Sequence, residues 1–220
     1  MARILSRQDL EVIGDELTRD FYRLRGIPSG VYLPLDPERF ITEYVRVRLL
    51  YLPPLDDSIL GLTVNECCTY IVHDRRDRRY ELQPGDIVIN SGLNRRECIG
   101  RRNFTLMHEA AHVLLGRRYP GEYAFRETHV YRLERAQRDW EEWQADNLAS
   151  VLLMPSPLVL QLLHSYSGFP KTLMRPDWEE EIGTDLVIRQ IADTLGVSVT
   201  ALIVRLRQLK LIYDPKKRSR

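Results

Sequence analysis

Residues 104–115 of this 220-residue chain read Phe-Thr-Leu-Met-His-Glu-Ala-Ala-His-Val-Leu-Leu. Most of these residues are good helix formers. On a helix, residues four apart lie one turn above each other, so His108 and His112 can bind one metal ion together. Glu109 is rotated by about 100° from His108, which keeps it out of direct coordination but near the open position of the metal. Glu109 is therefore the candidate general acid/base.

A third protein ligand must come from elsewhere, because a catalytic zinc normally takes three protein ligands and leaves the fourth position to water. Glu142 and Asp146 are four residues apart on one face of a second predicted helix. Glu142 can ligate through one carboxylate oxygen, and Asp146 can accept the free ring N–H of a ligand histidine. Glu141 heads an equally apolar row, but only Glu142 has an aspartate four residues further on. We therefore predict that Glu142 joins His108 and His112 as a zinc ligand.

Two kinds of periodicity flank this segment. Apolar residues recur at steps of three and four over Arg7–Arg25, which predicts an amphipathic helix. Asp36 caps a second predicted helix, which extends past Leu49 and which Pro53-Pro54 ends. β-branched and aromatic runs at residues 69–72 and 87–89, split by charged and proline-glycine turns, predict a small antiparallel sheet.

The composition is that of an ordinary globular protein, with 44% hydrophobic and 29% charged residues and a net charge of +1. No apolar tract reaches the ~20 residues that span a membrane. Residues 1–9 lack the apolar core of a secretion signal, so we expect a cytoplasmic protein outside the membrane. Cys67, Cys68 and Cys98 lack zinc or redox spacing and are expected to be reduced structural thiols.

The C-terminal region contains another pair of predicted helices. Two apolar stripes between Asp185 and Ile212, joined by the turn Gly196-Val197-Ser198, resemble a helix-turn-helix. Arg205, Arg207 and Lys210 could meet phosphate, but such helix pairs also serve as packing or partner-binding units. The near-neutral charge makes direct DNA contact the less favoured use of this region.

The two metal-site helices resemble those of the ImmA/IrrE-like metallopeptidases, in the two-helix arrangement of the gluzincin peptidases. The resemblance rests on Arg102–His112 and on residues 142–155, Glu-Trp-Gln-Ala-Asp-Asn-Leu-Ala-Ser-Val-Leu-Leu-Met-Pro. It is strong from about residue 87 to 155, weaker to about 212, and vague before 59. The family often has Leu-Gly where Ala110-Ala111 stands, and residues 117–139 match no pattern.

The resemblance implies a zinc-dependent peptidase, able to use manganese in vitro, that commonly cleaves a helix-turn-helix repressor encoded beside it. Together with the patterns above, it leads us to expect an α+β fold: a mainly helical, zincin-like peptidase domain with a small antiparallel sheet over residues 1–155, a helix-turn-helix-like region over 156–212 and a basic tail over 213–220. The alternative is a zinc-binding regulatory or DNA- or protein-binding module without turnover. An oxyanion donor is also expected, and the chemically able residues are Tyr119, Tyr123, His129, Tyr131, His164 and Tyr166.

Overall fold

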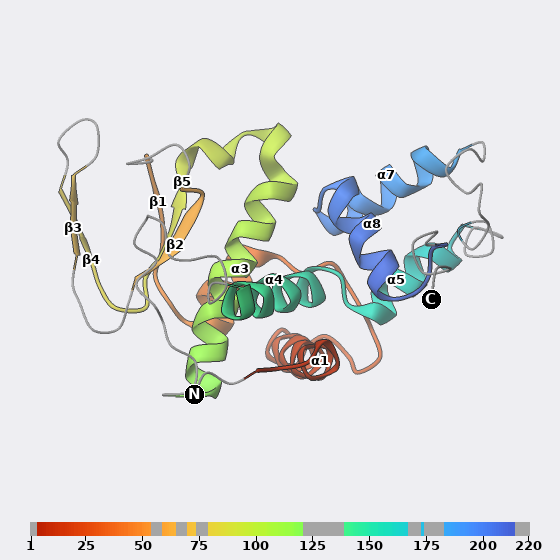
Figure 1. Ribbon diagram of the computed structural model, residues 1–220, viewed down its shortest axis with the longest axis horizontal. Coiled ribbons are helices and arrows are strands. Elements are labelled where there is room, and N and C mark those ends of the chain that lie inside the picture. The colour runs from red at the N-terminus through yellow and green to blue at the C-terminus, as the bar shows by residue number, and fades with distance from the viewer. Residues whose placement is uncertain are drawn as a thin grey trace.

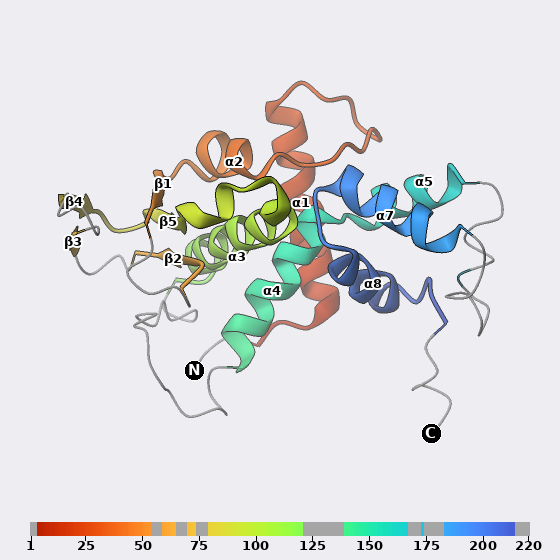
Figure 2. The same ribbon diagram turned by 90° about the horizontal axis from the view of Figure 1, so that it is seen from above.

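The computed structural model describes residues 4–53, 59–64, 70–73, 79–120, 139–166, 173 and 183–213. Its α-helices are α1 (Arg7–Leu24), α2 (Pro37–Arg39), α3 (Ile99–Arg118), α4 (Asp139–Leu153), α5 (Ser156–His164), α7 (Thr184–Leu195) and α8 (Val199–Gln208). The shorter turns are η1 (Phe40–Val45, π-helical), η2 (Ser91–Asn94) and η3 (Arg96–Cys98). The strands are β1 (Leu49–Leu52), β2 (Gly61–Thr63), β3 (Tyr70–His73), β4 (Arg79–Leu82) and β5 (Ile87–Asn90). The strands lie at one end of the molecule and α5, α7 and α8 at the other, with α1, α3 and α4 between them (Figure 1, Figure 2).

The sheet beside α3 is mixed, which corrects the prediction of an antiparallel sheet. Its strand order is β1-β5-β2, and the central strand β5 runs parallel to β1 and antiparallel to β2. Ile87 and Ile89 of β5 are fully buried. The prediction was wrong because β1 lies in a segment that was expected to be helical, so the parallel partner of β5 was not anticipated.

The helix that begins after Asp36 is shorter than predicted. The Asp36 side chain caps it by accepting a hydrogen bond of 3.1 Å from the backbone N–H of Arg39, as expected. The helical segment then ends at Val45, because Arg46 takes the left-handed conformation with a φ of 58°. The chain continues into β1, whose apolar and aromatic residues suit a strand. Pro53 therefore follows a strand and not a helix.

A separate hairpin consists of β3 and β4. The two strands are antiparallel, with Tyr70 opposite Leu82 and His73 opposite Arg79. The strand predicted at residues 69–72 is confirmed in this hairpin, whereas the predicted charged turn falls mainly on residues 74–78, outside the described residues. Figure 1 shows the hairpin standing apart from the three-stranded sheet.

The centre of the molecule is a set of three packed helices. Helix α1 begins with a reciprocal capping box between Ser6 and Asp9. Helix α4 packs against both α1 and α3. At the crossing with α1, a side chain added at Gly14 would place its Cβ 2.4 Å from Val151 Cγ1, so the two helices approach closely only because residue 14 is glycine. This packing fixes α4 relative to α3.

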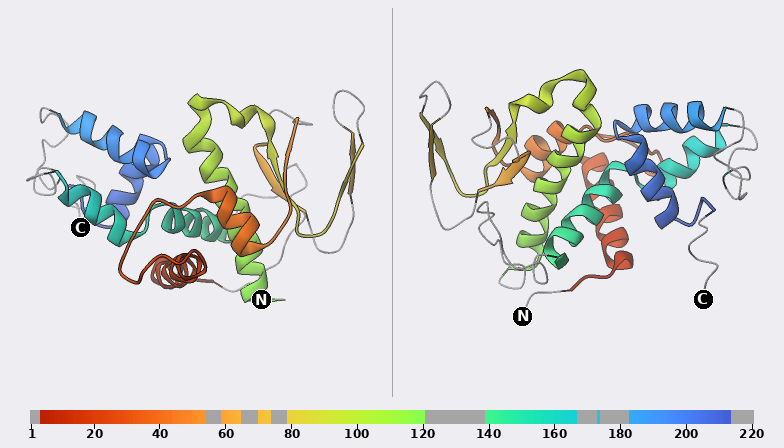
Figure 3. Two further views of the ribbon diagram at one scale, coloured as in Figure 1. Left: turned by 180° about the vertical axis from the view of Figure 1, so that it is seen from behind. Right: turned by 45° about the horizontal axis from the view of Figure 1, so that its top comes forward.

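The C-terminal helices share the main hydrophobic core, which extends from Leu10 of α1 to Leu206 of α8. Helices α7 and α8 meet at 95°, and Ser198 caps α8 as predicted. Their turn packs on the start of α3, where Asn103 Nδ2 donates to the Gly196 carbonyl at 2.9 Å. Seen from behind, these helices remain on the side of α3 and α4 opposite the sheet (Figure 3).

Arg205 of α8 is fully buried, so the suggestion that it could meet phosphate is wrong. Its guanidinium donates to both carboxylate oxygens of Glu11 in α1, and the Nη2–Oε2 distance is 2.9 Å. It also donates to the Met154 carbonyl at 2.9 Å and to Ser156 Oγ at 3.3 Å. Arg205 thus joins α8, α1 and the junction between α4 and α5.

No single helix in the described ranges is long and apolar enough to cross a membrane. Two pairs, α4 with α5 and α7 with α8, meet the length and composition requirements together, but they are bent by 45° and 95°.

Candidate metal centre

The two histidines of the His-Glu-x-x-His segment lie on one face of α3, as predicted. Their rings meet edge to face at 4.7 Å between centroids, and the two Nε2 atoms are 3.0 Å apart. Both side chains are largely buried, with 16% of His108 and 14% of His112 exposed. The two imidazoles therefore point their Nε2 atoms at a common position beside the helix.

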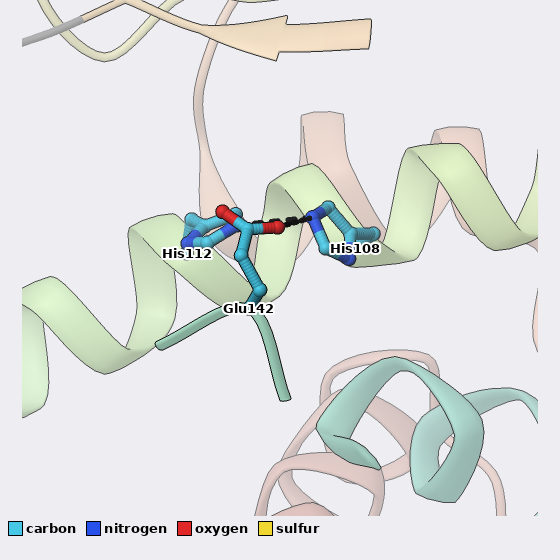
Figure 4. A group of neighbouring side chains, drawn as sticks. All are labelled: His108, His112 and Glu142. Carbon is cyan, nitrogen blue, oxygen red and sulfur yellow. Dashed lines mark hydrogen bonds and ion pairs between the residues drawn. The ribbon is translucent and has the colours of Figure 1, made fainter. Parts of the chain in front are cut away.

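Glu142 of α4 reaches the same position from the opposite side (Figure 4). Its Oε2 lies 3.2 Å from His108 Nε2, and its Oε1 lies 3.7 Å from His112 Nε2. One ligand atom from each of the three residues falls within 4.8 Å of the other two. The structure thus brings Glu142 to the histidines, and Glu141 is not part of this group.

The three side chains fit a metal ion such as zinc. Two ligands of one tetrahedral zinc, each about 2.0–2.1 Å from the ion, stand about 3.3 Å apart. The Nε2–Nε2 distance of 3.0 Å and the His108 Nε2–Glu142 Oε2 distance of 3.2 Å are close to that value, and the His112 Nε2–Glu142 Oε1 distance of 3.7 Å is somewhat longer. Two imidazoles and one carboxylate are also the donor set of many catalytic zinc sites.

Asp146 supports this group from one turn further along α4. Its Oδ1 lies 2.8 Å from Nδ1 of His108, the ring nitrogen that faces away from Glu142. A carboxylate in this place accepts the Nδ1–H and leaves Nε2 free to bind a metal, which fixes the tautomer and increases the basicity of the ring. This is the contact that the Glu-x-x-x-Asp spacing predicted.

The electrostatics of the cluster favour a positive charge. Burial alone would lower the pKa of His108, but the hydrogen bonds with Asp146 and Glu142 outweigh it and raise that pKa to about 10. The same contacts, first that with His108 and then that with His112, lower the pKa of Glu142 well below its usual range, against the opposing effect of burial. Two carboxylates around two imidazoles therefore stabilise a cation between them.

Glu109 lies outside this cluster and faces strand β2. Only 7% of the residue is exposed. The hydroxyl of Thr63 donates to Glu109 Oε2 at 2.8 Å, and it lies 3.2 Å from the backbone carbonyl of Glu109. A Cβ added at Gly61 would lie 3.1 Å from Glu109 Oε1 and 2.6 Å from Thr105 Cγ2. Strand β2 therefore packs directly on the carboxylate.

Thr63 and Gly61 were missed from the sequence. They are two residues apart and share one face of β2. The alternation of side chains along a strand is therefore the only sequence signal that could have grouped them. That signal is weak, because a three-residue strand does not show from its pattern which face meets a helix. Only the pairing of β2 with β5 and its packing on α3 identify the contact with Glu109.

Two further sets of side chains are the two tryptophans of α4 and the candidate oxyanion donors. Trp140 is 49% exposed, whereas Trp143 packs against the core. Of the proposed oxyanion donors, His164 lies beside the Leu160 carbonyl, Tyr166 donates to Gln190, and Tyr119 packs at the end of α3. Residues 123, 129 and 131 lie outside the described residues. The described geometry does not single out an oxyanion donor.

A helix that carries His-Glu-x-x-His and meets a carboxylate from a second helix is the arrangement typical of metal-dependent peptidases. The peptidase family described as the IrrE N-terminal-like domain matches residues 69–207, more than half of the chain. The chain therefore belongs to the ImmA/IrrE-like family, as the sequence motifs predicted. A comparison with curated proteins found no match to this sequence.

Proposed function

We propose that this chain is a zinc metallopeptidase that hydrolyses a peptide bond in one specific intracellular protein. The observation that carries the proposal is the convergence of His108, His112 and Glu142 next to the buried carboxylate of Glu109. A purely structural zinc site has no use for a carboxylate beside the open metal position. Membership of a peptidase family supports the same assignment.

Each residue has a separate role in this proposal. His108, His112 and Glu142 would hold the ion, and Asp146 would fix the tautomer of His108. An ion held by these three residues would supply Lewis-acid chemistry for the scissile carbonyl and for the attacking water. Glu109 accepts a proton from the attacking water and passes it to the departing amine nitrogen, so the reaction needs no covalent intermediate. Manganese is an expected substitute in vitro, since it also binds imidazole and carboxylate.

Strand β2 offers a place for an extended substrate. It is one of the two edge strands of the described three-stranded sheet, and the one that packs on α3 beside Glu109. The backbones of Leu60 and Val64, at the two ends of β2, form hydrogen bonds toward β5. In an antiparallel ladder the alternate residues, Gly61 and Thr63, direct their N–H and C=O groups away from β5. A peptide that paired with these groups would lie along the side of α3 that carries Glu109.

We further propose that the substrate is a helix-turn-helix repressor encoded beside this chain, whose cleavage releases DNA. Support comes from the family resemblance and from the cost of an unselective protease to a cell, which favours a narrow substrate range. Surfaces away from the metal centre, including α7 and α8, would supply recognition. Direct DNA binding by these helices is disfavoured, because Arg205 is paired with Glu11 in the interior.

Cleavage of that repressor is the test. The full chain is incubated with zinc or manganese and the repressor, with Glu109→Gln as the inactive control, and the products are followed by mass spectrometry. The expected result is one new pair of fragments, absent with Glu109→Gln, together with loss of operator binding. Rapid cleavage of casein would refute the claim of selectivity. An intact repressor, bound tightly by both forms, would instead favour a zinc-binding regulator without turnover.

A further inference from the structure

Glu109 receives a hydrogen bond that the peptidase reaction described above does not account for. The carboxylate of a general base in a buried site has to present one oxygen to water in a fixed direction. In this chain Oε2 receives the Thr63 hydroxyl at 2.8 Å, and Oε1 is the oxygen that a Cβ at Gly61 would approach to 3.1 Å. The two oxygens therefore have different surroundings, and both are set by β2.

We propose that Thr63 is a positioning residue for Glu109, a role that rests on the proposed peptidase function. Its hydroxyl holds Oε2, so that the carboxylate rotates less and keeps Oε1 available for the proton of water. Gly61 leaves the space that this orientation of the carboxylate occupies. The strand on which a substrate would pair would thus also align the general base.

The geometry favours the carboxylate over the backbone as the partner of Thr63. A hydroxyl has one hydrogen, and the Glu109 carbonyl at 3.2 Å is the more distant of its two acceptors. A hydrogen bond to an ionised carboxylate is also roughly twice as strong as one to a neutral group. Thr63 stands opposite Ile87 of the central strand, so pairing with β5 limits the movement of its backbone.

The test compares Thr63→Val, which keeps the shape and removes the hydroxyl, with Thr63→Ser, which keeps the hydroxyl. Thr42→Val is the matched control, since Thr42 is exposed and its hydroxyl donates only to the Glu38 carbonyl. Cleavage kinetics are measured with the repressor encoded beside the chain. Zinc affinity is measured by competition with a chelator.

We expect Thr63→Val to lower kcat about tenfold, as the loss of a charge-assisted hydrogen bond would, while KM changes less than about twofold. Thr63→Ser should recover to within about threefold of the original kcat. All variants should keep the original zinc affinity, because Thr63 is not one of the proposed metal ligands. An unchanged kcat in Thr63→Val, or a Thr63→Ser as slow as Thr63→Val, would overturn the proposal.

A second readout does not depend on turnover. Urea unfolding is compared for Thr63→Val in the original chain and in a Glu109→Ala background. A smaller shift of the midpoint in the Glu109→Ala background supports the coupling, whereas equal shifts would mean that the hydroxyl serves the backbone and would overturn it.

The two hypotheses fail in different ways. If Glu109→Gln abolishes cleavage and Thr63→Val does not slow it, only the positioning role is refuted. If the original chain cleaves nothing, the proposed function is refuted and the positioning role with it, whatever the unfolding data show.

Discussion

Removing the carboxylate of Glu11 is expected to destabilise the whole protein, because Glu11 neutralises the buried guanidinium of Arg205. Arg205 has no exposed surface and makes two of its hydrogen bonds with Glu11. Breaking such a pair leaves a buried charge without compensation and costs about 3–5 kcal/mol. The side chain of Glu11 is 29% exposed, so water can partly replace it and the lower end of the range, about 3 kcal/mol, applies. For a chain of this length that corresponds to a fall in Tm of roughly 6–12 °C.

Urea unfolding of the full chain, followed by circular dichroism, would measure this loss for Glu11→Ala. The matched control is Asp185→Ala, which removes the partner of Arg189 in an exposed pair whose side chains are 61% and 71% accessible. That change should shift the urea midpoint far less than Glu11→Ala does, because exposed ion pairs contribute little to stability. Replacing both buried partners, as Glu11→Leu with Arg205→Met, should restore most of the stability. If Glu11→Ala were no more destabilising than Asp185→Ala, the reasoning would be refuted.

Three further outcomes are expected. Glu142→Ala should abolish tight zinc binding while Glu141→Ala leaves it nearly unchanged, as a zinc titration against a chelator would show; the reverse order would transfer the ligand role to Glu141. Gly61→Ala should slow cleavage without removing zinc, because the new Cβ would meet Glu109 and push β2 away from α3; kinetics equal to the original chain would contradict this. In zinc-free protein, the urea midpoint should fall as the pH rises from about 6.5 through about 10. The pKa of His108 is higher in the folded than in the unfolded protein, so protonated His108 stabilises the fold fully at a pH below the unfolded pKa. That stabilisation is lost as the pH rises through the folded pKa. Asp146→Asn should flatten that dependence, and an equally steep profile in this variant would exclude Asp146 as a cause.

The grouping of the candidate metal ligands could be predicted from sequence because the spacing within each helix is local information. The spacing of His108 and His112 places them on one helical face whatever the rest of the fold does. The same rule applied to Glu142 and Asp146, whose spacing predicted that Asp146 accepts the ring N–H of one of the two histidines; Asp146 Oδ1 lies 2.8 Å from His108 Nδ1. The pairing of the two helices was not contained in either motif and came from the requirement for a third ligand and from the resemblance to a family.

The predictions that failed depend on an unusual backbone conformation and on contacts between distant segments, which local sequence patterns do not show. Arg46 ends a helix by taking a left-handed conformation, which arginine rarely adopts and which no neighbouring glycine or proline announces. Arg205 occurs in an amphipathic pattern that suits a surface, yet it is buried because Glu11, 194 residues away, neutralises it. The division into residues 1–155 and 156–212 stays a prediction, although the family match extends across it.

The close approach of α1 and α4 has a consequence for how this sequence can change. The Cβ of any larger residue at position 14 would occupy the place of the Val151 side chain, and Leu148 Cδ1 lies 3.5 Å away on the same side. A change at position 14 is therefore tolerated only together with a smaller residue at 151, or with a shift of α4 that would also move Glu142. Among relatives that keep the metal-binding helices, positions 14 and 151 should covary, and a pair such as Gly14→Ala with Val151→Ala should fold where Gly14→Ala alone is impaired.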